Sequence, residues 1–482
     1  MNYSVVIYIL GWIMEIEAAF LTLPGIVSAI YGESGGFAFL WVALGSAVAG
    51  SMIILHKPKN MRFYLREGFV TVALSWILMS VIGCLPFVIN GDIPHFADAL
   101  FEMISGFTTT GATVVSDVEG LTKGSLFWRS FSHWIGGMGV LVFLLAIVPM
   151  AGGSHMNLMK AESPGPSVGK LVPKVRQTAK YLYIIYFTLT MIEVIFLLFG
   201  GMNLFEALTT SFGTAGTGGF AIWNDGFVSV SPYNQWVVTI FMLLFGVNFG
   251  FYFLILTGKL RDALKFEEVR IYFIIVIASA VFIFINLRHF ALYAPVEGIR
   301  QAFFQVASII TTTGFASADF NLWPETSRTI LVLLMFIGAC AGSTGGGIKV
   351  SRFIIACKSF IKEIISYLHP RSVKKIKLEG KPLGHETLRA TNVYFMTYMV
   401  IFAVSVLLVS IENKDLVTNF AAVAATFNNI GPGLSLVGPM ANFGHFTDFT
   451  KYILMFDMLA GRLEIFPMLL LFCPTVWKRR RA

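Results

Sequence analysis

Long apolar stretches separated by short polar segments run through the whole chain of 482 residues. A helix of about 20 apolar residues is long enough to cross the hydrocarbon core of a bilayer. Stretches of this kind lie at 4–30, 36–55, 67–90, 127–150, 180–200, 234–257, 269–290, 327–357, 391–411 and 449–476. The pattern predicts an all-α integral membrane protein with ten transmembrane helices.

Composition and charge agree with this prediction. Hydrophobic residues make up 56% of the chain, charged residues only 13%, and the mean hydropathy is +0.75, which excludes a water-soluble domain. Basic residues gather in a few connecting segments, because 27 of the 35 Lys and Arg lie in 56–66, 160–180, 259–270, 349–389 and 478–481. By the positive-inside rule these segments are cytoplasmic. We therefore expect a protein of the plasma membrane with both termini on the cytoplasmic side. The basic residues are explained by this orientation, and we expect no nucleic-acid partner.

A short glycine-containing phrase recurs four times, each time after about 12 residues that favour a short helix. Its copies are Thr109-Thr110-Gly111-Ala112, Gly216-Thr217-Gly218-Gly219, Thr312-Thr313-Gly314-Phe315 and Asn429-Ile430-Gly431-Pro432. Each copy lies between two apolar stretches. The last eight helices thus form four helix–pore loop–helix repeats with pseudo-fourfold symmetry around a central pore, after two N-terminal helices.

This organisation divides the chain into five parts. They are an N-terminal transmembrane hairpin at 1–60 and pore repeats at 61–155, 156–262, 263–380 and 381–482. The third repeat includes an intramembrane loop and the longest basic connection. That connection, within 349–389, suits anionic lipid headgroups or a cytosolic partner.

The four loops are suited to binding a monovalent cation. A dehydrated cation needs a cage of oxygens, and backbone carbonyls provide one without burying a negative charge. The candidate ligands for such a cation are Thr109, Thr110, Gly111, Gly216, Thr217, Gly218, Thr312, Thr313, Gly314, Asn429, Ile430 and Gly431. The alternative is that these glycines only let membrane helices pack closely.

A second glycine-rich stretch, 338–347, interrupts the apolar run 327–357. Such a run is a poor helix, and non-helical backbone at this depth must be buried in protein or line an aqueous cavity. We predict a movable gate under the filter that includes Gly345, Gly346, Gly347 and Lys349. The alternative is a rigid break between closely packed helices.

Arg462 lies inside the last apolar stretch, where a charge normally faces protein or an aqueous cavity. We expect it to face the pore opposite the glycine-rich stretch, either to anchor carbonyl groups or to repel cations. The alternative is an internal ion pair with Asp457 or Glu464.

Other charged residues give weaker signals. Eight acids near the outer ends of the helices fit either an acidic vestibule that concentrates cations or ordinary solvated loops: Asp98, Glu102, Asp117, Glu119, Glu206, Asp225, Asp319 and Asp415. Glu15, Glu17 and Glu193 lie within apolar stretches, and the sequence leaves their role open. We expect His133 to be a packed, hydrogen-bonded residue. No cluster of residues suggests an enzyme.

The chain resembles the Trk/Ktr/HKT superfamily of potassium transporters, specifically the Trk membrane (pore-forming) subunits. The resemblance covers nearly the whole chain and is carried by segments 105–113, 217–220, 311–315 and 429–433. It implies a potassium-selective pore, a homodimer in the bacterial inner membrane, and gating by a cytosolic nucleotide-binding ring with RCK/KTN domains that bind ATP, ADP or NAD. Asn429-Ile430 and Gly216 depart from the threonines of the other loops.

The sequence therefore predicts potassium uptake through a channel-like pore with a carbonyl filter. Potassium is the transported ion, and we expect no organic cofactor in this chain. The alternative is a secondary carrier that couples potassium to protons or sodium, for which Glu193 is the main candidate among acids at midplane depth.

Overall fold

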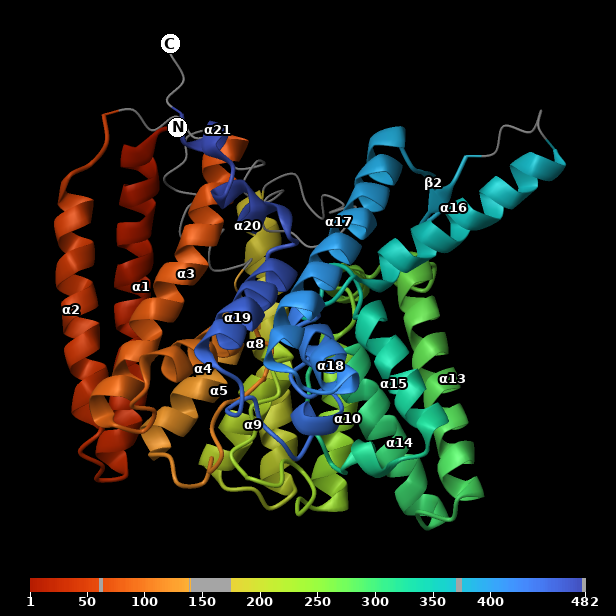
Figure 1. Ribbon diagram of the computed structural model, residues 1–482, viewed down its shortest axis with the longest axis horizontal. Coiled ribbons are helices and arrows are strands. Elements are labelled where there is room, and N and C mark those ends of the chain that lie inside the picture. Colours follow the sequence, from red (N-terminus) through yellow and green to blue (C-terminus); the bar gives the residue numbers. More distant parts are fainter. Residues whose placement is uncertain (60–63, 138, 140–174, 370–374, 479–482) are drawn as a thin grey trace.

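The computed structural model describes residues 1–59, 64–137, 139, 175–369 and 375–478, and this part of the chain is mostly helical (Figure 1). The N-terminal helices α1 (Tyr3–Ile30) and α2 (Gly36–Leu55) lie side by side. Small residues let them approach closely, because a Cβ atom at Gly50 would lie 2.9 Å from the carbonyl oxygen of Gly11. The two helices therefore pack directly against each other, and the division of the chain at residue 60 stays a prediction.

Four long helices are each followed by a shorter one. The long helices are α3 (Leu65–Asn90), α8 (Val175–Phe199), α13 (Glu267–His289) and α17 (His385–Val409). The shorter ones are α4 (Phe96–Phe107), α9 (Leu204–Gly216), α14 (Pro295–Ile310) and α18 (Leu416–Phe427). At about 1.5 Å per residue the shorter helices do not reach across a bilayer. They are the short helices predicted before each glycine loop.

The helices that follow the loops are short in the described residues. They are α5 (Lys123–Gly137), α10 (Pro232–Phe245), α15 (Glu325–Ile337) and α19 (Asp448–Arg462). The break after α15, before α16 (Val350–Leu368), was predicted. The prediction of one continuous helix at 234–257 and another at 449–476 was wrong, because each stretch is broken in the structure. The end of the predicted 127–150 stretch lies outside the described residues.

The two unexpected breaks have local causes. Between α10 and α11 (Phe249–Leu256) the axis turns by 88°. There the Asn248 side chain accepts the N–H of Gly250 at 2.8 Å and begins a new helix. Between α19 and α20 (Phe466–Leu471), Glu464 and Ile465 both have left-handed φ, 61° and 68°. Apolar composition hides such breaks, because all of these segments are buried or face lipid.

The remaining elements are short. They are the helices α12 (Leu260–Ala263) and α21 (Pro474–Trp477), the 3₁₀ turns Phe320–Leu322, Ser410–Glu412 and Ser435–Val437, and an antiparallel pair, β1 (Lys377–Leu378) and β2 (Lys381–Pro382). By length and composition, six helices of the described residues can cross a membrane, or seven if the bent pair counts as one. The count of ten stays a prediction.

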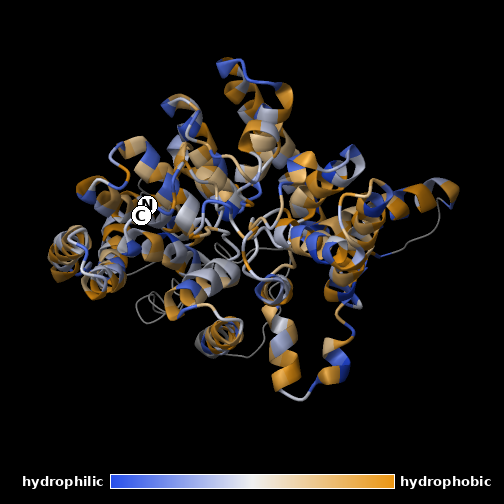
Figure 2. Cartoon of the chain, turned by 90° about the horizontal axis from the view of Figure 1, so that it is seen from below, coloured by the Kyte–Doolittle hydropathy of each residue, from blue (hydrophilic) through white to orange (hydrophobic). Residues whose placement is uncertain are grey.

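The N-terminus lies beside the last described residue, because the N-terminal ammonium donates to the carbonyl of Lys478 at 3.0 Å. The N-terminus, α21 and the β1–β2 hairpin lie at the same end of the molecule (Figure 1). In the perpendicular view, hydrophobic stretches dominate the helices at the rim (Figure 2). Large hydrophobic side chains such as those of Leu55 and Phe199 are exposed, which suits contact with lipid.

Candidate functional site

The four short helices end in the same backbone turn. A residue with left-handed φ follows each helix: Thr109 (54°), Thr217 (56°), Thr312 (58°) and Asn429 (55°). The next N–H bonds to the carbonyl five residues earlier at 2.8–2.9 Å, from Thr110 to Ser105, Gly218 to Gly213, Thr313 to Ser308 and Ile430 to Ala425. A left-handed residue other than glycine costs roughly 1–2 kcal/mol. The surrounding structure therefore imposes one conformation on four different sequences.

Each loop then has a glycine that faces the backbone of another loop. A Cβ atom would lie 2.0 Å from the oxygen of Gly218 at Gly111, 2.0 Å from that of Thr313 at Gly219, 1.9 Å from that of Ile430 at Gly314, and 2.8 Å from that of Thr110 at Gly431. These spaces exclude a side chain. The contacts run from the first loop to the second, third and fourth, and back to the first. The four loops thus form a closed ring.

The second loop differs from its expected alignment by one residue. The sequence pattern paired Gly218 with Gly111, but Gly219 has the left-handed φ of 74° and the inter-loop contact that Gly111 has. Gly216 is the last residue of α9 and matches Thr108, not Thr109. The pair Gly219-Phe220 repeats Gly314-Phe315, and this signal would have given the correct register.

Carbonyl oxygens of the ring have no hydrogen-bond donor among the described residues. Within the described residues, no hydrogen bond reaches the carbonyl oxygens of Thr109, Thr110, Thr217, Gly218, Thr312, Thr313, Asn429 and Ile430. The side chains of the threonines and of Asn429 are fully buried. A buried carbonyl without a partner costs free energy that a cation or water ligand would recover. The ring therefore offers oxygen atoms for a ligand.

Asn429, which departs from threonine, fixes the fourth loop. Its amide Nδ2 donates to Thr110 Oγ1 and to the carbonyl of Met458, both at 2.9 Å. The first bond crosses from the fourth loop to the first, and the second holds the loop against α19. The substitution thus changes a side-chain contact behind the ring and leaves the backbone turn unchanged.

The glycine-rich segment 338–349 lies directly against the third and fourth loops. The N–H of Gly346 donates to Thr312 Oγ1 at 2.6 Å. A Cβ atom at Gly345 would lie 2.9 Å from the oxygen of Thr311, and one at Gly346 would lie 2.9 Å from that of Asn428. The predicted gate residues therefore touch the glycine loops.

Lys349 closes this segment on itself. Its side chain is buried, and its ammonium donates to the carbonyl of Gly346 at 3.0 Å and also to that of Gly345. Two carbonyls of the segment are thereby bonded to a cation of the protein itself. The segment is consequently held in a compact conformation.

Arg462 contacts the same segment from the end of α19. Its guanidinium donates to the carbonyl of Thr344 at 2.9 Å and to that of Gly136 at the end of α5 at 2.6 Å. The alternative ion-pair partners have other contacts: Glu464 pairs with Arg352, and Asp457 accepts from Ser405 at 2.7 Å. Arg462 thus links the segment to the first repeat.

Glu268, on α13, was missed by the sequence analysis. Its carboxylate accepts the N–H of Ala341 at 2.7 Å and that of Ser351 at 3.0 Å. One of these N–H groups belongs to the glycine-rich segment and the other to the first turn of α16, so the carboxylate joins the two. A buried Glu in a basic-flanked apolar stretch gives no signal of this role, because its partners are backbone groups far along the chain.

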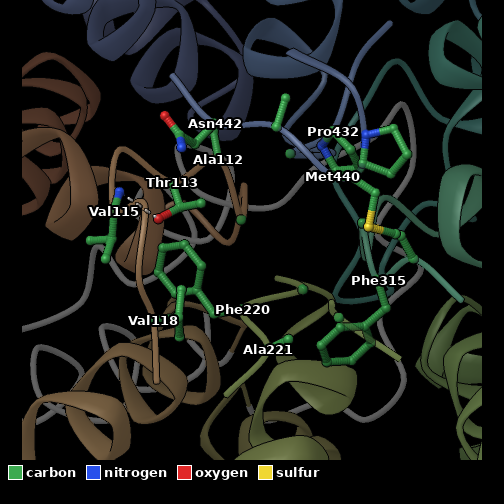
Figure 3. Close-up of a pocket in the computed structure, with 18 of the residues that line it drawn as sticks. Ala112, Thr113, Val115, Val118, Phe220, Ala221, Phe315, Pro432, Met440 and Asn442 are labelled. Atoms are coloured by element: carbon green, nitrogen blue, oxygen red, sulfur yellow. Dashed lines mark hydrogen bonds between the residues drawn. The ribbon is translucent and has the colours of Figure 1, made fainter. Parts of the chain in front are cut away.

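A cavity opens on one side of the ring (Figure 3). All four ring glycines and the residues after them, Ala112, Phe220, Phe315 and Pro432, line it. Thr113, Val115, Val118 and Asn442 extend its wall. The cavity therefore leads to the ring from the side that carries the short connecting loops.

The acids expected near this entrance have mainly structural contacts. Glu102 is buried and pairs with Arg129 at 2.8 Å, so it is not part of an acidic vestibule. Glu206 and Asp415 cap α9 and α18. Asp117 is solvated, and a hydrogen bond from Asn224 lowers its carboxyl pKa. Among the described residues, no group of three or more His, Cys, Asp or Glu is placed to hold a metal ion.

Comparisons with known proteins agree on one family. Residues 37–479 match the family model TrkH, described as a cation transport protein. The Trk system potassium uptake protein TrkH of Escherichia coli K12 is 37% identical over 99% of this chain and 100% of its own length, and TrkG of the same organism is 31% identical over 99% of both. The crystal structure of the potassium transporter TrkH from Vibrio parahaemolyticus has a TM-score of 0.87, with 33% identity over 99% of this chain and 100% of that one.

We expect Gly219→Ala to damage the ring. The new Cβ would lie 2.0 Å from the Thr313 oxygen at a left-handed φ, which costs roughly 1–2 kcal/mol before the clash. Ion uptake should fall by roughly tenfold or more. Gly45→Ala, on α2 with no atom within 4 Å of the new Cβ, is the control. Equal uptake by the two variants in a potassium-requiring strain, at equal protein level, would contradict the assigned register.

Glu268→Ala should loosen the segment 338–349. Without the carboxylate, two buried N–H groups lose their acceptor, at a cost of about 1–3 kcal/mol each. The melting temperature of the purified variant should be lower than that of the wild type, and its ion flux should also differ from that of the wild type. Glu267→Ala, which removes the partner of Lys358, is the control and should have a small effect on both. A normal melting temperature in Glu268→Ala would refute this role.

Proposed function

Since this chain belongs to the TrkH family of cation transport proteins, we propose that it takes up potassium through a channel-like pore whose filter is made of backbone carbonyls. The observation that carries the proposal is the closed ring of four glycine loops, with eight carbonyl oxygens that no donor among the described residues reaches. Carbonyl oxygens replace the hydration shell of a passing potassium ion. A ring of four loops supplies them from all sides of one axis.

The proposed ligands follow the observed register of the loops. They are the backbone oxygens around Thr109, Thr110, Gly111, Thr217, Gly218, Gly219, Thr312, Thr313, Gly314, Asn429, Ile430 and Gly431. Gly219 takes the place first given to Gly216. The pseudo-fourfold, ten-helix arrangement in five parts, 1–60, 61–155, 156–262, 263–380 and 381–482, is part of this proposal.

The short helices favour a cation at the ring. All four end at the ring with their C-termini, which carry the partly negative end of the helix dipole. A cation at this position is stabilised and an anion is repelled. This field adds selectivity by sign of charge to the coordination by carbonyls.

We assign the gate to the segment 338–349, with Gly345, Gly346, Gly347, Lys349 and Arg462. The segment presses against two of the four loops, and its conformation depends on bonds from Lys349, Arg462 and Glu268 to its backbone. These few bonds can break together while the packed helices stay in place. An opening therefore needs no rearrangement of the whole fold.

The assembly proposed is that of a bacterial inner-membrane protein with both termini cytoplasmic. The relatives are named as parts of a Trk system, which supports a further component. We propose a homodimer controlled by a cytosolic nucleotide-binding ring, with ATP, ADP or NAD bound to that ring. Basic residues of α16 and around the β1–β2 pair are the surface offered to it or to anionic lipid headgroups: Lys358, Lys362, Lys375, Lys377 and Lys381.

Electrical recording tests passive conduction against coupled transport. In bilayers with a potassium gradient, a passive pore reverses at the potassium potential, about 59 mV for each tenfold gradient. Proton and sodium gradients should leave this value unchanged. A reversal potential that follows the proton or sodium gradient would overturn the channel proposal in favour of a coupled carrier, and would direct attention to Glu193, which is buried in α8.

Arg462→Ala should raise flux through the open pore. The change removes a positive charge beside the conduction path and frees the carbonyls of Thr344 and Gly136, so we expect a several-fold increase in conductance. Arg462→Lys keeps the charge but cannot bridge both carbonyls with the planar fork of an arginine, and should give an intermediate value. If Arg462→Ala lowers expression but leaves the single-channel conductance unchanged, this role is contradicted.

A further inference from the structure

Two side chains on α5 grip the second loop at Phe220, the residue after Gly219. The Arg129 guanidinium lies over the Phe220 ring, 4.2 Å from its centre, and the His133 ring lies 4.3 Å from it. His133 Nε2 also accepts the N–H of Phe220 at 3.2 Å. Arg129 and His133 are one helical turn apart, so they share one face of α5.

The other ends of these side chains bind the first repeat. Arg129 Nε donates to the carboxylate of Glu102 on α4 at 2.8 Å. His133 Nδ1 donates to the carbonyl of Gly106 at 2.7 Å. Because Nδ1 faces a carbonyl and Nε2 faces an N–H, the imidazole is neutral and both of its nitrogens are used. Both side chains thus connect α4, which leads to the first loop, with the second loop.

The connection lies at one junction of the ring. A Cβ atom at Gly111 of the first loop would lie only 2.0 Å from the oxygen of Gly218 in the second loop, two residues before Phe220. A shift of Phe220 would therefore move this oxygen relative to the first loop. The residues that make this connection are at most 2% exposed: Glu102, Arg129, His133 and Phe220.

A buried ion pair is an expensive way to obtain stability. The cost of removing two charges from water commonly equals or exceeds their attraction. The third repeat fills the position of Glu102 with the neutral Gln305, whose amide lies 3.3 Å from Ser317 Oγ. The fold therefore does not need a charge at this position in every repeat, and the pair at Glu102 calls for a function beyond packing.

We propose that Arg129, held by Glu102, is a positioning residue for ion selectivity. It sets the separation of the carbonyls of the first and second loops by fixing Phe220 against α4. The inference rests on the proposed carbonyl filter. Arg129 does not contact the ion; it acts through the backbone of the second loop. Its loss widens the tolerance of the ring for ions of other radii and lowers discrimination against sodium.

The test compares the potassium-to-sodium permeability ratios of two double variants, each of which neutralises one ion pair. The double variant Glu102→Gln/Arg129→Gln removes both charges, so that neither is left buried alone. The matched control is Asp98→Asn/Lys451→Gln, which removes the pair between α4 and α19 one turn away. From reversal potentials in mixed potassium and sodium, we expect the first variant to lose roughly tenfold in selectivity for potassium over sodium. The control should keep the wild-type ratio.

Phe220→Leu gives a second test without any change of charge. It removes the ring beneath the guanidinium and keeps the backbone N–H for His133, so we expect a lower ratio here as well. A wild-type ratio in either Phe220→Leu or the double variant would overturn the positioning role. An equal loss in the control pair would also overturn it, since the effect would then be general. A wild-type protein that shows no potassium-selective current would instead refute the proposed pore.

Discussion

The rest of the structure depends on four backbone positions at which no side chain fits. At Gly111, Gly219 and Gly314 the next loop's carbonyl oxygen takes the place of a Cβ atom, and Gly431 completes the circle more loosely. These contacts fix how near the loops come to a common axis. The long helices, the short helices and the left-handed turns together bring the backbone of the four loops to this distance, and no donor in the described part of the chain reaches the loop oxygens.

Three basic side chains of the protein lie close to the ring. Lys349 and Arg462 bind carbonyls of the segment beneath, and Arg129 binds Glu102 behind the first loop. In a low-dielectric setting each charge must be paired or hydrogen-bonded. Because these cations are engaged with backbone or carboxylate oxygens, they hold the structure around the ring and do not bind the loop carbonyls that we propose as ligands of a mobile cation.

Local patterns in the sequence predicted the parts of this structure that depend on local physics. Apolar length identified the long helices, and the recurring Thr-Gly phrase located the loops. The second loop was displaced by one residue, because Gly216, Gly218 and Gly219 all fit a glycine pattern and only the contact with Thr313 distinguishes them. The breaks after Phe245 and Arg462 were missed, since hydropathy does not respond to a bend inside an apolar stretch. Contacts between residues far apart in the chain, such as that of Glu268 with Ala341, have no local signature in the sequence.

Because the four loops belong to one chain and differ in sequence, each loop can have its own side-chain contacts. The turns are alike to within a few degrees of φ, yet the second loop is gripped through Phe220, the third bonds the segment beneath through Thr312, and the fourth is tied to the first through Asn429. In four identical subunits, each of these contacts would occur four times, and a segment pressing on two loops would press on all. Separate sequences remove that constraint. The uniform backbone can then serve ion coordination, while the unlike side chains behind it serve support and control.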